Sequence, residues 1–145
     1  MLTKKQLINK INGIEWEDRG KKENDIFIKF ILYYISFEVL TKIKNFDKYT
    51  LNKDIEEEFF NVADSKILEN LKSILDERPL INMLEPSREV RLNDIHDFPN
   101  ILMFVNYSRN NLFHGDKSLD IERDKIIINY DCQILEKLIN SIIAI

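Results

Sequence analysis

Glycine and proline are scarce in this chain, with three of each among 145 residues. β-Sandwiches and β-barrels need many tight turns, and those turns depend heavily on glycine and proline. We therefore expect an all-α fold in which long helices are joined by few loops. The length suits one hydrophobic core, so the prediction is a single domain over residues 1–145.

Cysteine is nearly absent too, and Cys132 alone cannot form an intrachain disulfide. No signal peptide is expected, because Lys4 and Lys5 lead directly into polar sequence. Both features are typical of a cytoplasmic protein. The most apolar stretch, residues 26–40, is interrupted by polar side chains and is shorter than the roughly 20 residues of a membrane-spanning helix. We expect a buried helix there, and no membrane partner.

The chain lacks an excess of positive charge, since 21 Lys and Arg face 25 Asp and Glu, for a formal net charge of −4. This balance argues against nonspecific coating of nucleic acid, but leaves room for a local phosphate site. There is no glycine-rich phosphate loop and no G-x-S-x-G motif. Two histidines and one cysteine make a structural zinc site improbable. No metal and no cofactor are expected.

Apolar residues at spacings of three and four predict helices along most of the chain. The expected ranges are about 3–12, 25–44 with Asn24 or Asp25 as its cap, 54–62, 64–76, a helix that begins at Asp97, and about 120–143. Segment 13–24 holds two glycines and seven charged residues, so we expect a loop anchored to the core by Trp16. Segment 78–96 is expected to be a second loop. Cys132 lies on an apolar stripe and is expected to be buried.

Arg109 and His114 lie near the end of the fifth predicted helix, in the sequence YSRNNLFHGDK, and two interpretations are open. As helix-end residues, Arg109 complements the dipole and His114 caps the last carbonyls before Gly115. As site residues, the arginine fork matches phosphate oxygens and the histidine transfers protons near neutral pH. Together they supply the phosphate-binding group and the proton-transfer group that metal-free cleavage of RNA requires.

Helix geometry restricts the second interpretation. Five residues along a helix rotate by about 140° and rise by roughly 7.5 Å, so the two side chains do not begin on one face. They converge only if Arg109 reaches along the helix, if the turn at Gly115 redirects His114, or if a second subunit completes the site.

The segment RNNLFHG at residues 109–115 resembles the R-x-x-x-x-H signature of the HEPN superfamily. An arginine followed by asparagine, with a His-Gly pair at the end, is the common form of that motif. The specific likeness covers SRNNLFHGDK, and the helical layout extends a looser likeness over most of the chain. The aromatic-rich helix at 25–44 looks like the long first core helix of that family.

The resemblance implies an antiparallel bundle of about five to six helices that forms a homodimer, with the motifs of both subunits in one interface cleft. Active members are metal-independent ribonucleases, in which the RNA 2′-OH attacks the adjacent phosphate and leaves a 2′,3′-cyclic phosphate and a 5′-OH. By position, His114 would handle protons or orient the phosphate, and Arg109 would stabilise charge on the pentacoordinate phosphate. Asn110 would hold the motif or bind the phosphate, and Lys117 is a candidate substrate-binding residue.

The resemblance also implies partners, and the sequence departs from the family motif at one position. RNA, a second copy of the chain, and an antitoxin or defence-system protein are the expected partners, without DNA. In toxins silenced by adenylylation, a tyrosine follows two residues after the histidine, and here Asp116 occupies that position. The departure and the acidic composition favour the alternative, a non-catalytic HEPN module that binds RNA, a nucleotide or a partner protein. An unrelated helical protein is the third possibility.

Overall fold

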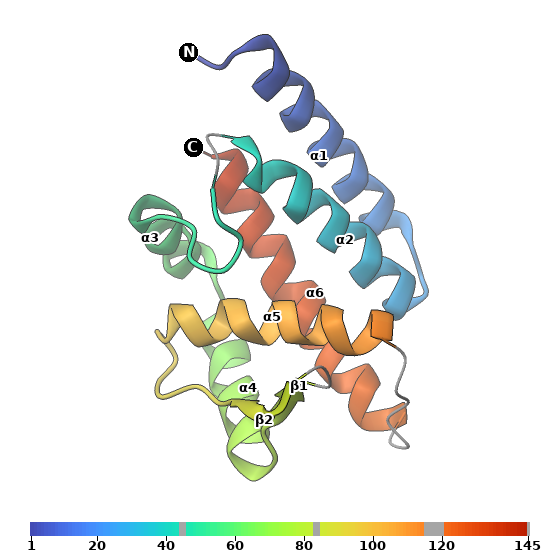
Figure 1. Cartoon of the computed structure of the whole chain (residues 1–145), viewed down its shortest axis with the longest axis vertical. Coiled ribbons are helices and arrows are strands. Elements are labelled where there is room, and N and C mark those ends of the chain that lie inside the picture. The colour runs from blue at the N-terminus through green and yellow to red at the C-terminus, as the bar shows by residue number, and fades with distance from the viewer. Residues whose placement is uncertain (44–45, 83–84, 115–120, 145) are drawn as a thin grey trace.

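The computed structural model describes residues 1–43, 46–82, 85–114 and 121–144, and within them the elements are helices joined by loops, apart from one short hairpin (Figure 1). The expected all-α bundle is confirmed. The helices are α1 (Lys4–Lys22), α2 (Ile26–Thr41), α3 (Lys53–Val62), α4 (Ser65–Glu77), α5 (Phe98–His114) and α6 (Ile121–Ile143), and the strands are β1 (Leu80–Asn82) and β2 (Glu85–Val90).

Side-chain caps determine where four helices begin. Thr3 and Gln6 form a reciprocal capping box at the start of α1. The carboxylate of Asp25 accepts two backbone N–H bonds at the start of α2, as expected for its cap. Asn52 and Asp64 cap α3 and α4 in the same way. Each cap satisfies amide groups that have no partner inside the helix.

The expected loop at residues 13–24 is wrong, because α1 continues through it to Lys22. Gly13 and Gly20 are buried and face α2. A Cβ on Gly13 would lie 2.5 Å from the Leu40 side chain, and a Cβ on Gly20 would lie 2.6 Å from the Tyr33 ring. The two glycines therefore allow close packing of α1 on α2.

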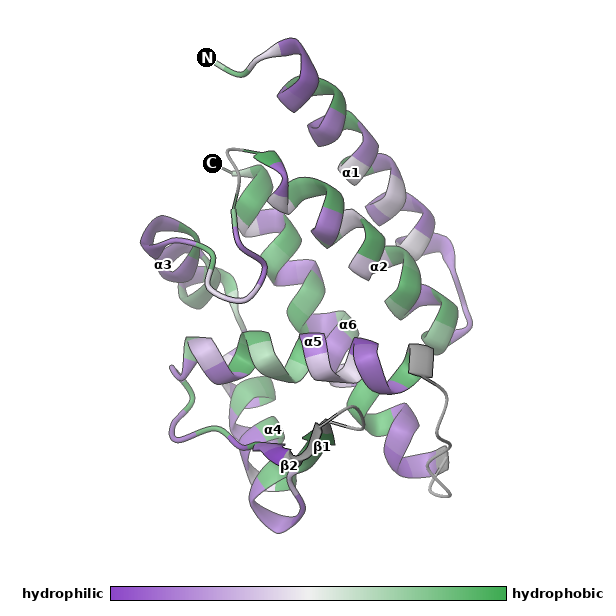
Figure 2. Ribbon diagram, viewed as in Figure 1, coloured by the Kyte–Doolittle hydropathy of each residue, from purple (hydrophilic) through white to green (hydrophobic). Residues whose placement is uncertain are grey.

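Trp16 does not anchor this segment in the core as expected. It is half-buried, and the Arg19 guanidinium lies 4.9 Å from its ring centroid on the same helix. The helix is joined to α2 instead by the Ser36 hydroxyl, which donates a 2.6 Å hydrogen bond to the Gly13 carbonyl. Most of α1 is hydrophilic, whereas α2 is strongly hydrophobic (Figure 2).

Three long helices lie side by side, and α5 lies across one of them, α6 (Figure 1). α1 and α2 are antiparallel, and α6 runs beside α2 in the same direction, with both chain termini at one end of the molecule. The Cys132 thiol on α6 is buried, as expected, and donates to the Ile26 carbonyl at the start of α2 (3.8 Å). Fully buried aromatic and aliphatic side chains fill the space between these helices, including Phe30, Phe37, Phe104, Leu135 and Leu138.

Segment 78–96 is only partly the expected loop, because it contains the antiparallel hairpin β1–β2. Leu80 pairs with Val90, and Val90 is fully buried. The Asn111 side chain on α5 donates a 2.9 Å hydrogen bond to the Ile81 carbonyl. The hairpin therefore lies against the end of α5 that carries the R-x-x-x-x-H segment.

None of the helices in the described ranges is both long enough and apolar enough to cross a lipid bilayer.

Candidate functional site

Arg109 lies in the last part of α5 and is half-buried. Its guanidinium carbon is 5.9 Å from the centroid of the Tyr34 ring on α2, a distance typical of a cation–π contact. Its Nη1 donates to Oδ1 of Asn110 at 3.5 Å, at the long limit of a hydrogen bond. The structure thus brings two of the expected site residues together, and it directs the arginine toward α2.

Tyr34 is part of a buried polar network beside Arg109. Its hydroxyl donates a 2.6 Å hydrogen bond to Oδ1 of Asn106, one turn before Arg109 on α5. The Asn106 amide donates to the carbonyls of Leu102 (2.8 Å) and Lys48 (3.3 Å). Burial raises the pKa of Tyr34 well above its usual value, with a smaller effect from Glu38 in the same direction and an opposing one from Arg109. The tyrosine therefore stays neutral and keeps its donor proton.

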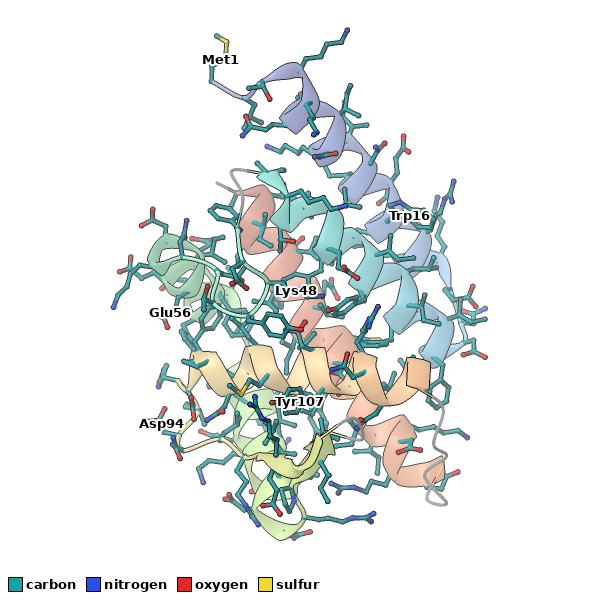
Figure 3. All side chains as sticks on the ribbon, viewed as in Figure 1. Met1, Trp16, Lys48, Glu56, Asp94 and Tyr107 are labelled. Carbon is teal, nitrogen blue, oxygen red and sulfur yellow. The ribbon has the colours of Figure 1, made fainter. Side chains whose placement is uncertain are left out.

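Lys48 brings a second cation to the same ring. Its Nζ lies 5.7 Å from the Tyr34 centroid and 5.5 Å from the Tyr49 centroid. The carboxylate of Glu38 is 3.7 Å from that nitrogen, a long contact between partly exposed groups. Figure 3 places Lys48 between α2 and α5. Two positive side chains thus flank one buried tyrosine in a chain of negative net charge.

His114 closes α5, and its side chain lies outside the described part of the structure. Arg109 and His114 are therefore on one continuous helix, where a spacing of five residues corresponds to a rotation of about 140° around the helix axis. Gly115, Asp116 and Lys117 are outside the described residues. The expected substrate contact of Lys117 and the helix-ending role of Gly115 thus remain predictions.

The two asparagines of the RNNLFH segment have different partners. Asn110 contacts Arg109, whereas Asn111 binds the hairpin carbonyl. Of this pair, Asn110 is the one placed beside the guanidinium.

A buried acid lies on the inner side of α5. Asp131 on α6 is fully buried, and neither carboxyl oxygen has a hydrogen-bond partner within the described residues. Its polar neighbour is Ser108, whose hydroxyl already donates to the Phe104 carbonyl (2.9 Å). Burial raises the pKa of Asp131 well above its usual value, and Ser108 opposes this more weakly. The raised pKa favours the neutral, protonated carboxyl, which avoids a buried unpaired charge.

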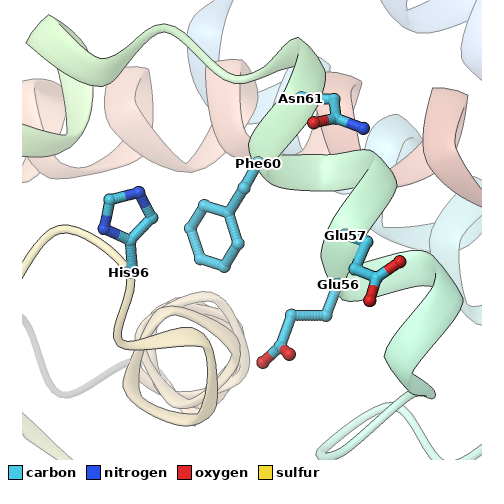
Figure 4. Close-up of a pocket in the computed structure, with 5 residues that line it drawn as sticks. All are labelled: Glu56, Glu57, Phe60, Asn61 and His96. Atoms are coloured by element: carbon cyan, nitrogen blue, oxygen red, sulfur yellow. The ribbon is translucent and has the colours of Figure 1, made fainter.

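An open pocket occurs elsewhere, between α3 and the start of α5 (Figure 4). It is lined by Glu56, Glu57, Phe60, Asn61 and His96. The His96 ring packs edge-on against Phe60, with centroids 5.0 Å apart. Its ionisable lining is acidic apart from this histidine, so it does not suit a phosphate. In the described ranges no three His, Cys, Asp or Glu side chains are grouped so that they could hold a metal ion.

Sequence reasoning missed Tyr34, which contacts Arg109, and also Lys48 and Asn106, which contact Tyr34. Asn106 is separated from Lys48 by 58 residues and from Tyr34 by 72, so no local spacing could connect them. The available signals were weak: a polar residue on an apolar stripe of α5, and a lysine beside a tyrosine between two helices.

Comparison with known proteins does not assign the chain to a family. No protein-family model matches it, and neither does any curated protein or solved structure. The functional interpretation therefore depends on the residues of the chain itself.

Proposed function

We propose that this protein is a metal-independent endoribonuclease of the HEPN type, acting as a homodimer. The observation that carries the proposal is that Arg109 and Lys48 both contact the Tyr34 ring, while Asn110 accepts from Arg109 on the helix that His114 closes. Two cations on one tyrosine, in an otherwise acidic protein, suit a local phosphate site. The residue with the best proton-transfer chemistry lies on the next turns of the same helix.

In this proposal, the RNA 2′-OH attacks the adjacent phosphorus while a histidine base takes its proton. The bond to the 5′ oxygen breaks, that oxygen receives a proton, and a 2′,3′-cyclic phosphate forms. His114 performs the proton transfers: it takes the proton of the 2′-OH and then gives a proton to the 5′ oxygen. Arg109 stabilises the additional negative charge on the pentacoordinate phosphate, and Asn110 holds the guanidinium in place.

RNA cleavage by the purified protein tests the proposal. We expect cleavage that survives EDTA and gives ends with a 2′,3′-cyclic phosphate and a 5′-OH. His114→Ala and Arg109→Ala should lose at least about 100-fold of the rate, the usual contribution of general acid–base catalysis or of one charge-stabilising group. His96→Ala, which changes the other histidine, is the matched control and should cleave normally. Full activity in a folded His114→Ala protein would contradict the proposal.

The composite nature of the site has its own test. If Arg109 and His114 of different subunits act together, mixed dimers of His114→Ala and Arg109→Ala chains contain one complete site. We expect the mixture to regain activity that neither variant has alone. Light scattering should give the mass of a dimer, and a monomeric active protein would exclude a shared site.

The alternative is a non-catalytic HEPN module that binds RNA, a nucleotide or a partner protein. Two observations favour this alternative. Lys48 is paired with Glu38, and Arg109 is half-buried, so each cation has limited contact with a phosphate. RNA or partner binding without cleavage by the unmutated protein would support this alternative. For either activity we propose a cytoplasmic role in a toxin–antitoxin, antiphage or stress-response system, with an antitoxin or defence protein as a further partner.

A further inference from the structure

We infer that the turn at residues 47–51 is a second RNA-binding element, in which Lys48 contacts a phosphate and Tyr49 stacks on a base of a single strand. This inference rests on the proposed function, because it assumes that the same strand also reaches Arg109. The turn contains no residue that the sequence motif singles out.

The turn is held in one conformation by its own hydrogen bonds. The Asp47 carboxylate accepts from the Tyr49 amide (2.8 Å), and the Asp47 carbonyl accepts from the amides of Thr50 (3.2 Å) and Leu51 (2.7 Å). Leu51 has a φ of 51°, in the left-handed region, where the chain turns toward α3. A binding element that is ordered before the ligand arrives loses less conformational entropy when it binds.

The turn is also fixed to the helix that carries Arg109. The Asn106 amide donates to the Lys48 carbonyl, and Asn106 is itself held by the buried Tyr34 hydroxyl. This anchor uses the Lys48 backbone and does not involve the Lys48 side chain. The anchor survives replacement of that side chain, so the lysine can be tested without moving the turn.

Lys48 is placed to share a nucleic-acid strand with Arg109. Both cations contact the Tyr34 ring, and the sum of their distances to its centroid limits their separation to about 12 Å. The Lys48 side chain is 27% exposed, and its ion pair with Glu38 is long at 3.7 Å. A phosphate, which accepts charge-assisted hydrogen bonds well, can therefore replace the carboxylate.

Tyr49 supplies the aromatic surface. The Tyr49 side chain is 46% exposed. Tyr34, whose ring contacts the same lysine, is 2% exposed and cannot stack on a ligand. An exposed aromatic ring beside a cation is the arrangement with which proteins bind unpaired bases and the adjoining backbone. The pairing of the two functions in adjacent residues favours a single-stranded RNA over a duplex, whose bases are stacked on each other.

Binding of a labelled single-stranded RNA oligonucleotide to the full-length His114→Ala protein separates binding from cleavage. In this background, Lys48→Gln should weaken binding severalfold and reduce the slope of log K against log salt by about 0.7, the value for one phosphate contact on a single strand. Glu38→Gln should strengthen binding, because it frees the lysine. Lys5→Gln changes an exposed lysine at the far end of α1 and should leave affinity and slope nearly unchanged.

The stacking role predicts a different pattern. Tyr49→Leu should lower the affinity roughly tenfold with little change in the salt slope, and Tyr49→Phe should bind like the parent. Circular dichroism checks that each variant is folded. Parental affinity in Lys48→Gln or in Tyr49→Leu would overturn the inference, as would an absence of RNA binding by the unmutated protein. RNA binding that depends on both residues, in a protein that never cleaves, would overturn the proposed catalysis and support this inference.

Discussion

The hydroxyl of Tyr34 donates a 2.6 Å hydrogen bond to the side-chain oxygen of Asn106, and so joins α2 to α5 across 72 residues of sequence. Both side chains are buried. The bond lies next to the ring that Arg109 and Lys48 contact, and Asn106 extends it to the backbone of the 47–51 turn. A single buried donor thus supports three parts of the candidate site.

Removal of that donor should destabilise the fold. In Tyr34→Phe the ring remains, but the Asn106 oxygen is left buried without its donor, which costs roughly 1–3 kcal/mol. Denaturant unfolding followed by circular dichroism measures the change. Tyr49→Phe removes the hydroxyl from a much more exposed tyrosine and should change the free energy of unfolding little; equal effects in the two variants would contradict the buried network.

Asp131 should make stability depend on pH in an unusual direction. Its folded pKa is raised, so the folded protein keeps a proton that the unfolded chain releases near the usual value of 3.8. The contribution of Asp131 is fully present below that value and is lost as pH rises toward the folded pKa, with a slope of at most about 1.4 kcal/mol per pH unit. Asp131→Asn cannot ionise, so its free energy of unfolding should fall less between pH 4 and 7 than that of the unmutated protein. Parallel stability curves for the two proteins would show that Asp131 is ionised in the fold.

The close approach of α1 and α2 should make both glycines intolerant of a side chain. Alanine favours a helix by about 1 kcal/mol over glycine, but overpacking costs about 1–3 kcal/mol. Gly20→Ala should be the more damaging, because its Cβ would meet the rigid Tyr33 ring, whereas at Gly13 it would meet the flexible Leu40 side chain. Thermal unfolding compares them with Asn12→Ala, an exposed change on the same helix that should be neutral or slightly stabilising. A gain in stability for Gly20→Ala would contradict the packing.

Cys132 should report opening of the core. Burial raises the pKa of its thiol to about 12, so the reactive thiolate is rare at neutral pH and is also inaccessible. We expect a thiol reagent to label the native protein slowly and the protein in denaturant rapidly. Fast labelling under native conditions would mean that the α2–α6 interface opens easily.

The sequence predicted the features that depend on neighbouring residues. The cap at Asp25 and the burial of Cys132 follow from local chemistry and from a helical repeat, and the structure has both. The R-x-x-x-x-H segment was placed correctly at the end of a helix for the same reason.

The errors arose where a distant partner decides the outcome. Glycine lowers helix propensity, so the two glycines of residues 13–24 suggested a loop. In the fold they lie within a helix, because Leu40 packs against Gly13 and Tyr33 packs against Gly20. The β1–β2 hairpin receives a hydrogen bond from Asn111, which is 30 residues away in the sequence. Lys48 joined the site only through Asn106 and Tyr34, which no spacing in the sequence connects.

The two halves of α1 should differ in the lifetime of their backbone hydrogen bonds. No residue before Gly13 is buried, and Leu7, Ile8 and Ile11 are each about half exposed. The first turns are held by the Thr3 capping box and by helical bonds alone, and a segment of this kind opens without unfolding of the core. Amide hydrogen exchange should therefore be fast up to about Gly13 and slow beyond it, so that one continuous helix contains two levels of local stability.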